Sequence, residues 1–481
     1  MKKSLIIGCF MVLLLPCLVL AAPEIKRNSD GFTITESVTD EFISQIKDEK
    51  GQLPAGKLVF RLSKVADADL VKLCAAFPEM TSLSISDSKT LASLAPLAEM
   101  KSLLAINVDN VAVSDLAPLG GLITVQSLSL KSDTIKDVTP LASLTRLHSL
   151  SLKSNALRDL APLASLTNLQ SLTVDCEFDM PDMKWMSGMT RIGTLNINNS
   201  GRNGGYLSSL EGLPRLTLRS VDLNGAGIKP TDLTPLVNAL PDLQTLNFRY
   251  TILPDLTPLS KLANLTKLNM YGAVVKDFSP LAQCPKLKVL NYYAVTNADF
   301  NTLGALTQVE EFDGGLTKLD DISWIVNLPK LTKLRLFAEY ITDYSPLSKT
   351  NIRHLTIWSM RTPVGDLAAL KGMKSLTYLK LWDLDDLTNF AALGSISSLE
   401  ELELAKTNSK SGEAIDLGFV SKLVNLKTFT ISDTANLANL NNPKVLDGIK
   451  GLPKIQKVTL PKNIFSEEQL KGFPANVLNL R

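Results

Sequence analysis

The sequence predicts an α/β repeat solenoid, a right-handed coil with one parallel β-sheet on its concave side and short 3-10 or helical turns on its convex side. The first supporting observation is a recurring pattern of three apolar residues separated by two and then one variable residue. It is clearest at Leu147–Leu152, Leu265–Met270 and Leu376–Leu381. Because residues two apart face the same side of a strand, each unit is expected to form one strand with its apolar residues inward.

The second observation is the regularity of the spacing. About 17 units follow one another at intervals near 22 residues, which predicts stacked units that bury their apolar sides against each other. The middle apolar residue of each unit is Leu83, Ile106, Leu128, Leu150, Leu172, Leu195, Val221, Leu246, Leu268, Leu290, Phe312, Leu334, Leu355, Leu379, Leu402, Phe429 and Val458.

The third observation is a segment that follows the strand in the better units: Asp, an apolar residue, any residue, Pro and Leu. The aspartate can accept backbone N–H bonds at a turn, and the proline suits the start of a short helical turn. We therefore expect 3-10 turns on the convex side. The segments are Asp115–Leu119, Asp137–Leu141, Asp159–Leu163, Asp255–Leu259, Asp277–Leu281 and Asp343–Leu347.

These units resemble the 22-residue leucine-rich repeats of bacterial internalins and of the related phosphatase-regulatory-subunit subclass. The resemblance covers residues 80–461 and implies a leucine-rich-repeat horseshoe that binds a partner outside the cytoplasm, in adhesion or virulence. The sequence departs from the pattern at the asparagine that usually follows the strand, which is clear only at Asn155. It also shows no wall-sorting signal after the repeats.

The division of the chain follows from these patterns. Residues 1–21 read as a signal peptide: Lys2 and Lys3 precede an apolar run that ends near Ala21. Residues 22–79 are expected to form an N-terminal cap, with helices at 36–49 and 67–77 and a strand at 58–62. Residues 80–461 form the solenoid, and residues 462–481 a C-terminal capping strand.

The net charge and the predicted signal peptide indicate which kinds of partner and which location to expect. The formal net charge is +2, so nothing predicts a nucleic-acid partner. Export predicts a secreted protein or one in the periplasm or cell envelope, with no stable membrane insertion after cleavage. An uncut membrane anchor is the alternative, although the run is short for a span. After cleavage Cys74, Cys176 and Cys284 remain, too far apart for a disulfide between them.

Catalytic patterns are missing from the sequence. The two histidines, His148 and His354, are about nine repeats apart, and His354 is expected to face the concavity as a solvated polar residue. No phosphate loop, zinc spacing or nucleophile elbow is present. Asn28–Gly31 reads as a polar turn rather than a calcium loop. The sequence therefore predicts no enzyme, no metal site and no cofactor.

The concave face of the later units is the predicted partner-binding site. Aromatic residues follow the third apolar position of neighbouring units, and basic residues lie beside them: Tyr271, Tyr293, Phe337, Trp358 and Trp382, with Lys333, Arg335 and Lys380. Exposed aromatic residues among charges are typical of protein-binding surfaces, which predicts a protein partner. Four alternatives stay open: aromatic stacking that only stabilises the sheet, glycan binding, a purely structural envelope protein, and an enzyme whose catalytic pattern is not recognised.

Overall fold

A computed structural model describes residues 24–481, with gaps at 55, 178, 199–206, 224–231, 254, 316–317, 338, 359–365, 385–386, 407–414, 433–436, 439 and 441. The predicted signal peptide at 1–21 lies outside these residues. Among the described residues, no helix is long and apolar enough to span a membrane.

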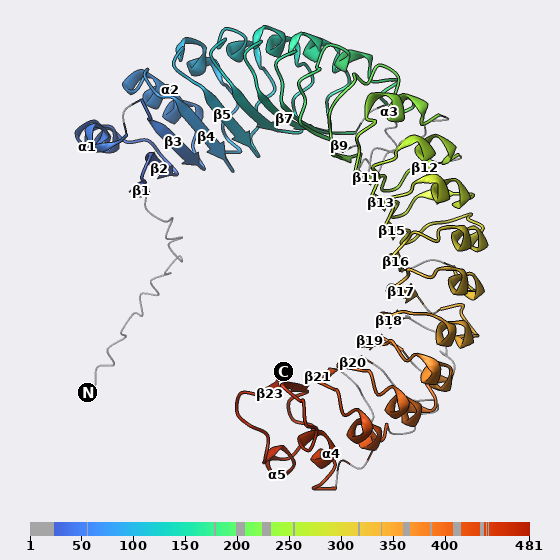
Figure 1. The fold of residues 1–481 in the computed structure, drawn as a ribbon. Helices are drawn as coiled ribbons and strands as arrows, with labels where there is room; N and C mark the ends of the chain where they lie inside the picture. Colours follow the sequence, from blue (N-terminus) through green and yellow to red (C-terminus); the bar gives the residue numbers. More distant parts are fainter. Residues whose placement is uncertain are drawn as a thin grey trace, which may run out of the picture.

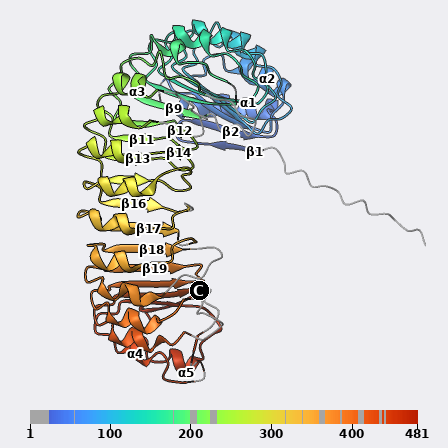
Figure 2. The ribbon, with the colours of Figure 1, turned by 90° about the vertical axis from the view of Figure 1, so that its right-hand side faces the viewer.

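The described residues form a horseshoe whose inner side is one curved sheet of 21 strands (Figure 1). A view turned by 90° shows that the strands stack one after another along the coil (Figure 2). They are β1 Glu24–Arg27, β2 Gly31–Thr35, β3 Val59–Ser63, β4 Ser82–Ser86, β5 Ala105–Asp109, β6 Ser127–Lys131, β7 Ser149–Ser154, β8 Ser171–Cys176, β9 Thr194–Asn198, β10 Ser220–Asp222, β11 Thr245–Asn247, β13 Lys267–Asn269, β15 Val289–Asn291, β16 Glu311–Gly314, β17 Lys333–Phe337, β18 His354–Trp358, β19 Tyr378–Trp382, β20 Glu401–Ala405, β21 Thr428–Ser432, β22 Lys457–Leu460 and β23 Leu478–Leu480.

The repeat register runs through the whole stack. From β2 to β23 each strand of this sheet pairs in parallel with the next strand of the sheet, and the middle apolar residues lie side by side, as in Leu268, Leu290 and Phe312. All 17 predicted middle positions lie in strands, from Leu83 in β4 to Val458 in β22. Their side chains belong to one continuous buried core. The predicted parallel concave sheet is confirmed.

The convex side carries short turns of 3-10 helix, as predicted. In the predicted segments the turn begins two residues after the aspartate, whose carboxylate accepts the backbone N–H there, for example Asp137 from Thr139 at 2.8 Å. The 3-10 turns are η1 Lys50–Gln52, η2 Ala95–Glu99, η3 Ala117–Leu119, η4 Thr139–Ser143, η5 Ala161–Ser165, η6 Lys184–Met186, η7 Thr257–Lys261, η8 Ser279–Gln283, η9 Phe300–Ala305, η10 Ser323–Asn327, η11 Ser345–Lys349, η12 Leu367–Gly372, η13 Phe390–Ser395 and η15 Leu417–Lys422.

Five α-helices and a small second sheet complete the described elements. The helices are α1 Asp40–Glu49, α2 Asp67–Ala76, α3 Thr234–Ala239, α4 Asp447–Lys450 and α5 Glu467–Leu470. The second sheet pairs β12 Ile252–Leu253 with β14 Val274–Val275.

The N-terminal end differs in detail from the expectation. The predicted helix from residue 36 begins at Asp40 instead, because the Thr39 side chain accepts the Phe42 N–H and caps it there. The polar turn at Asn28–Gly31 connects β1 and β2, which pair antiparallel as a hairpin. This hairpin was not predicted from the sequence. Gly31 is required there, since a Cβ would lie 1.8 Å from the Val59 carbonyl oxygen.

The three described cysteines, Cys74, Cys176 and Cys284, are all buried and free. Their burial raises the thiol pKa to about 12, about 12 and about 11 respectively. They pack as small apolar side chains of the core.

Candidate functional site

The strand register arranges the concave side chains of β16 to β20 in parallel rows. Side chains alternate between core and concavity along each strand, so aligned residues of neighbouring strands lie about 4.8 Å apart. The first row is Glu311, Lys333, His354, Tyr378 and Glu401; the second is Asp313, Arg335, Thr356, Lys380 and Glu403; the third is Phe337, Trp358, Trp382 and Ala405.

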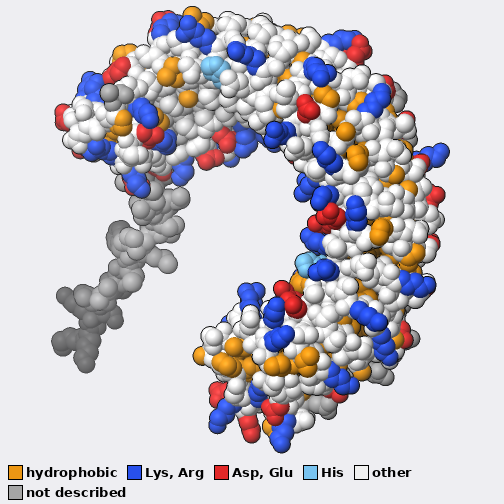
Figure 3. All heavy atoms as spheres, in the orientation of Figure 1, with side chains coloured by type: hydrophobic (Ala, Val, Ile, Leu, Met, Phe, Trp, Pro, Cys, Tyr) orange, Lys and Arg blue, Asp and Glu red, His pale blue; other side chains and the backbone are white. Residues whose placement is uncertain are grey.

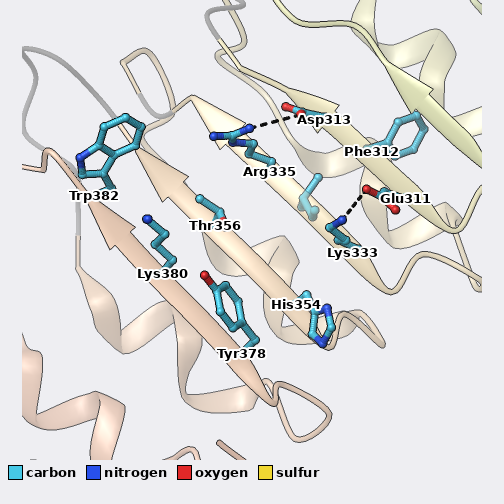
Figure 4. A pocket seen from close by; sticks show the side chains of 11 residues that line it. Glu311, Phe312, Asp313, Lys333, Arg335, His354, Thr356, Tyr378, Lys380 and Trp382 are labelled. Carbon is cyan, nitrogen blue, oxygen red and sulfur yellow. Dashed lines mark hydrogen bonds and ion pairs between the residues drawn. The ribbon is translucent and has the colours of Figure 1, made fainter. Parts of the chain in front are cut away.

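The first two rows enclose a hollow of about 460 Å³, which we call the concave hollow (Figure 4). Thr356 lies at its centre, because its side chain is short and its neighbours on both sides are long. Its other lining residues are Glu311, Phe312, Asp313, Lys333, Leu334, Arg335, His354, Tyr378, Lys380 and Trp382. A space-filling view shows acidic and basic side chains along this inner rim of the horseshoe (Figure 3). The predicted cations Lys333, Arg335 and Lys380 therefore meet in one place.

Ion pairs between strands hold these charges. Lys333 Nζ lies 2.6 Å from Glu311 Oε1, and Arg335 Nη1 lies 3.4 Å from Asp313 Oδ2. Both pairs join β16 to β17 (Figure 4). Their side chains are between a quarter and a little over half exposed, so each pair adds little to stability, typically below about 1 kcal/mol.

Lys380 is held from two sides. Its Nζ lies 2.8 Å from Glu403 Oε1 and 5.5 Å from the centre of the Trp382 ring. Burial, followed by the carboxylates of Glu403 and Glu401, raises the pKa of Tyr378. The phenol therefore stays protonated and can donate a hydrogen bond at any physiological pH.

The aromatic side chains form a stack that we call the aromatic ladder: Tyr250, Tyr271, Tyr293, Trp358 and Trp382. Consecutive ring centres are 5.2, 4.8, 6.0 and 5.5 Å apart. The last three contacts are face to face, with interplanar angles of 8°, 16° and 23°. The ladder therefore crosses several repeats as one unit.

Two glycines make this stacking possible. A Cβ on Gly272 would lie 2.5 Å from the Tyr250 ring, and one on Gly315 would lie 2.2 Å from the Tyr293 ring and 3.2 Å from Trp358. Tyr293 and Trp358 belong to units three apart, yet their rings meet over the space that Gly315 leaves.

The prediction that all five aromatic residues are exposed is wrong for two of them. Phe337 is only 3% exposed and Trp358 only 6%. Phe337 lies under the Trp358 ring with centres 4.7 Å apart, and Trp358 is enclosed between Tyr293 and Trp382. Tyr271, Tyr293 and Trp382 remain partly exposed. The stacking alternative thus accounts for the buried members.

His354 faces the concavity as predicted, and it is exposed and lines the concave hollow. The centres of its ring and that of Tyr378 are 5.7 Å apart. The sequence reading did not single out Thr356 or Tyr378 as site residues. Aligning the units by strand register would have placed both beside the predicted cations.

The concave face of the N-terminal half has small polar residues in the same second row: Ser84, Asn107, Ser129, Ser151, Thr173 and Asn196. Among the described concave residues of β4 to β9, charges occur in the third row alone, where Lys131 pairs with Asp109 and Lys153 with Asp175. No group of three or more potential metal-binding side chains occurs in the described part of the chain.

Comparison with known proteins identifies the fold. No protein family model matches the chain, and no curated protein is similar to it in sequence. A leucine-rich-repeat protein of Leptospira interrogans is 18% identical over 80% of this chain and 97% of its own, with a TM-score of 0.54. TLR13, solved in complex with ssRNA13, is 15% identical over 92% of this chain and 60% of its own, also with a TM-score of 0.54.

An internalin (inlF) from Listeria monocytogenes str. 4b F2365 is 23% identical over 75% of this chain and 89% of its own, with a TM-score of 0.45. A bacterial leucine-rich-repeat protein is thus among the structures that share this fold, as the repeat predicted. The two matches at 0.54 show a common fold. The chain is a leucine-rich-repeat solenoid.

Proposed function

We propose that this chain is a non-enzymatic protein-binding module that receives its partner on the concave face between β16 and β20. The concave hollow is the observation that carries the proposal. It combines an open volume of about 460 Å³ with cations, acids and the partly exposed Trp382. Aromatic and arginine side chains in such a setting supply most of the binding energy of protein interfaces.

The aromatic ladder favours a protein partner over a glycan. A sugar ring stacks on the free face of an aromatic ring. Both faces of Tyr293 are covered, by Tyr271 and Trp358, and both faces of Trp358 by Tyr293 and Trp382. These two inner rings present only their edges, which suit the mixed polar and apolar contacts of a protein surface.

The place of action in this proposal is outside the cytoplasm, by secretion or in the periplasm or cell envelope. The basic start and apolar run of residues 1–21 support it. A role in adhesion or virulence is what the resemblance of the 22-residue repeats to those of internalins implies. A structural envelope protein would need no hollow on its concave face, so the hollow argues for binding.

The proposal is tested by filling the hollow without touching the ladder. Thr356→Arg places a long side chain at its centre, and Ser151→Arg places the same side chain at the equivalent row position of β7. Both proteins are used to capture partners from bacterial envelope and host extracts beside the unchanged chain. We expect Thr356→Arg to lose, and Ser151→Arg to keep, a protein that the unchanged chain captures.

Two results would count against the proposal. Equal capture by Thr356→Arg and the unchanged chain would move the binding surface elsewhere. Hits on a glycan array that depend on Trp382 would replace the protein partner with a sugar. Circular dichroism of each variant verifies that the repeats remain folded.

A further inference from the structure

The charges around the concave hollow have a fixed order across five neighbouring strands. In the second row the order is acid, cation, neutral residue, cation and acid: Asp313, Arg335, Thr356, Lys380 and Glu403. The first row also begins and ends with acids, Glu311 and Glu401. Cations thus surround a neutral centre, and the acids form the two outer edges.

The acids that pair with Arg335 and Lys380 are on the outer strands β16 and β20. The sides of the two cations that face Thr356 carry no ion pair among the described residues. Arg335 is 43% exposed in its side chain, and its one polar contact among the described residues is the 3.4 Å approach to Asp313. A guanidinium has five N–H donors in a planar fork. Most of these donors are therefore available to a ligand in the hollow.

The spacing suits one carboxylate. The backbones of Arg335 and Lys380 lie on β17 and β19, two strand spacings or about 9.6 Å apart, on either side of Thr356. A carboxylate group placed above Thr356 is therefore within reach of both long side chains, each of which can donate a charge-assisted hydrogen bond of about 2.8 Å to it. Thr356 below it offers a hydroxyl that has no protein partner among the described residues.

We propose that the concave hollow binds one aspartate or glutamate side chain of the protein partner, between Arg335 and Lys380 and above Thr356. This inference rests on the proposed function and specifies its ligand chemistry. The acidic edges select an isolated carboxylate with basic neighbours. A nucleic acid or a sulfated glycan would bring further anions against Glu311, Glu401 and Glu403.

The N-terminal half supplies a matched comparison. Its third row has the same outer acids and inner cations, Asp109, Lys131, Lys153 and Asp175. The two lysines there lie on adjacent strands, with no neutral residue between them. A carboxylate therefore has no open position between two cations, and Lys153→Gln serves as the control variant.

The test uses three short labelled peptides and the full chain. One peptide has a single glutamate between two lysines, the second replaces that glutamate with glutamine, and the third is oligoglutamate. Fluorescence anisotropy should show the first bound at least about tenfold more tightly than the other two. Arg335→Gln and Lys380→Gln should each weaken it about fivefold or more, and Lys153→Gln should leave it unchanged.

Equal binding of the glutamate and glutamine peptides would overturn the inference, as would no binding of any peptide at millimolar concentration. Tighter binding of oligoglutamate would instead assign a polyanion site. A partner whose capture is lost in Thr356→Arg but unaffected by Arg335→Gln and Lys380→Gln would contradict the carboxylate inference and leave the proposed function standing.

Discussion

The strands β5 to β8 and β16 to β19 have the same fold and register but different concave surfaces. The second row of the former holds Asn107, Ser129, Ser151 and Thr173, and that of the latter holds Asp313, Arg335, Thr356 and Lys380. The inward leucines of both stretches pack alike. Repeat stacking depends on the core positions, so the concave positions can change without altering the fold.

The difference also extends into the core. The third apolar position is Leu130 and Leu152 in the N-terminal half, but Tyr292 and Gly314 in the later units. Tyr292 is fully buried, and a Cβ on Gly314 would lie 2.3 Å from its hydroxyl oxygen. A large side chain thus occupies the space that its neighbour leaves.

The largest change in stability is expected when leucine, the residue of the N-terminal half, replaces Gly314 beside Tyr292. Gly314→Leu introduces a side chain into space that Tyr292 fills, and overpacking should destabilise the fold by about 3 kcal/mol. The double variant Tyr292→Leu/Gly314→Leu restores the ordinary leucine pattern and should recover most of the loss. Urea unfolding midpoints measure both. A single variant as stable as the unchanged chain would contradict the large and small pairing.

A smaller loss is expected at Gly315. Gly315→Ala places a methyl group against Tyr293 and should separate its ring from Trp358, at a cost of about 1 kcal/mol. The separation should also shift the tryptophan fluorescence. Gly193→Ala in the N-terminal half is the control, because its nearest contact would be an ordinary 3.7 Å. Identical spectra for the two variants would show that Gly315 does not support the ladder.

The next expected loss of stability, similar to that at Gly315 or smaller, concerns a hydrogen bond at the end of β15. The Asn291 side-chain oxygen accepts the Tyr293 N–H at 3.1 Å, just beyond the strand. Asn291→Ala should cost about 1 kcal/mol, whereas Ser129→Ala in the same row of β6 should change stability by less than about 0.5 kcal/mol. Thermal unfolding of both variants checks the contrast, and an equal cost would remove it.

The smallest expected difference concerns the cysteines. Burial raises the pKa of Cys176 in the N-terminal half to about 12 and of Cys284 in the later units to about 11. At pH 8 roughly one Cys284 thiol in a thousand, or fewer, is ionised. Mass spectrometry should find both unmodified by iodoacetamide in the folded protein and both modified in urea. Rapid native labelling of either would contradict its burial.

The fold was largely predictable because the repeat signal lies in the chain itself. Every middle apolar residue, from Leu83 to Val458, is in a strand, because inward leucines two apart fit only that geometry here. The hairpin of β1 and β2 was missed because Glu24–Arg27 has no apolar alternation. The hairpin is held by the pairing of β2 with β3, which lies more than twenty residues further along the chain.

The candidate site was only partly predictable. The positions of Lys333, Arg335 and Lys380 followed from strand spacing, and they do meet at the hollow. The burial of Phe337 and Trp358 did not follow, because it depends on how rings from units three apart lean across Gly315. Side-chain direction beyond a strand end is set by neighbours that the repeat pattern does not specify.

The account's central claim is that the partner contacts β16 to β20 and not the N-terminal half. Site-specific photocrosslinking tests it most directly, with benzoylphenylalanine placed at Glu401, beside the hollow in the first row of β20, or, in a separate protein, at Ser127 in the same row of β6. Cross-links to a partner from position 401 and none from position 127 are the predicted result. Cross-links from position 127 alone would contradict the claim.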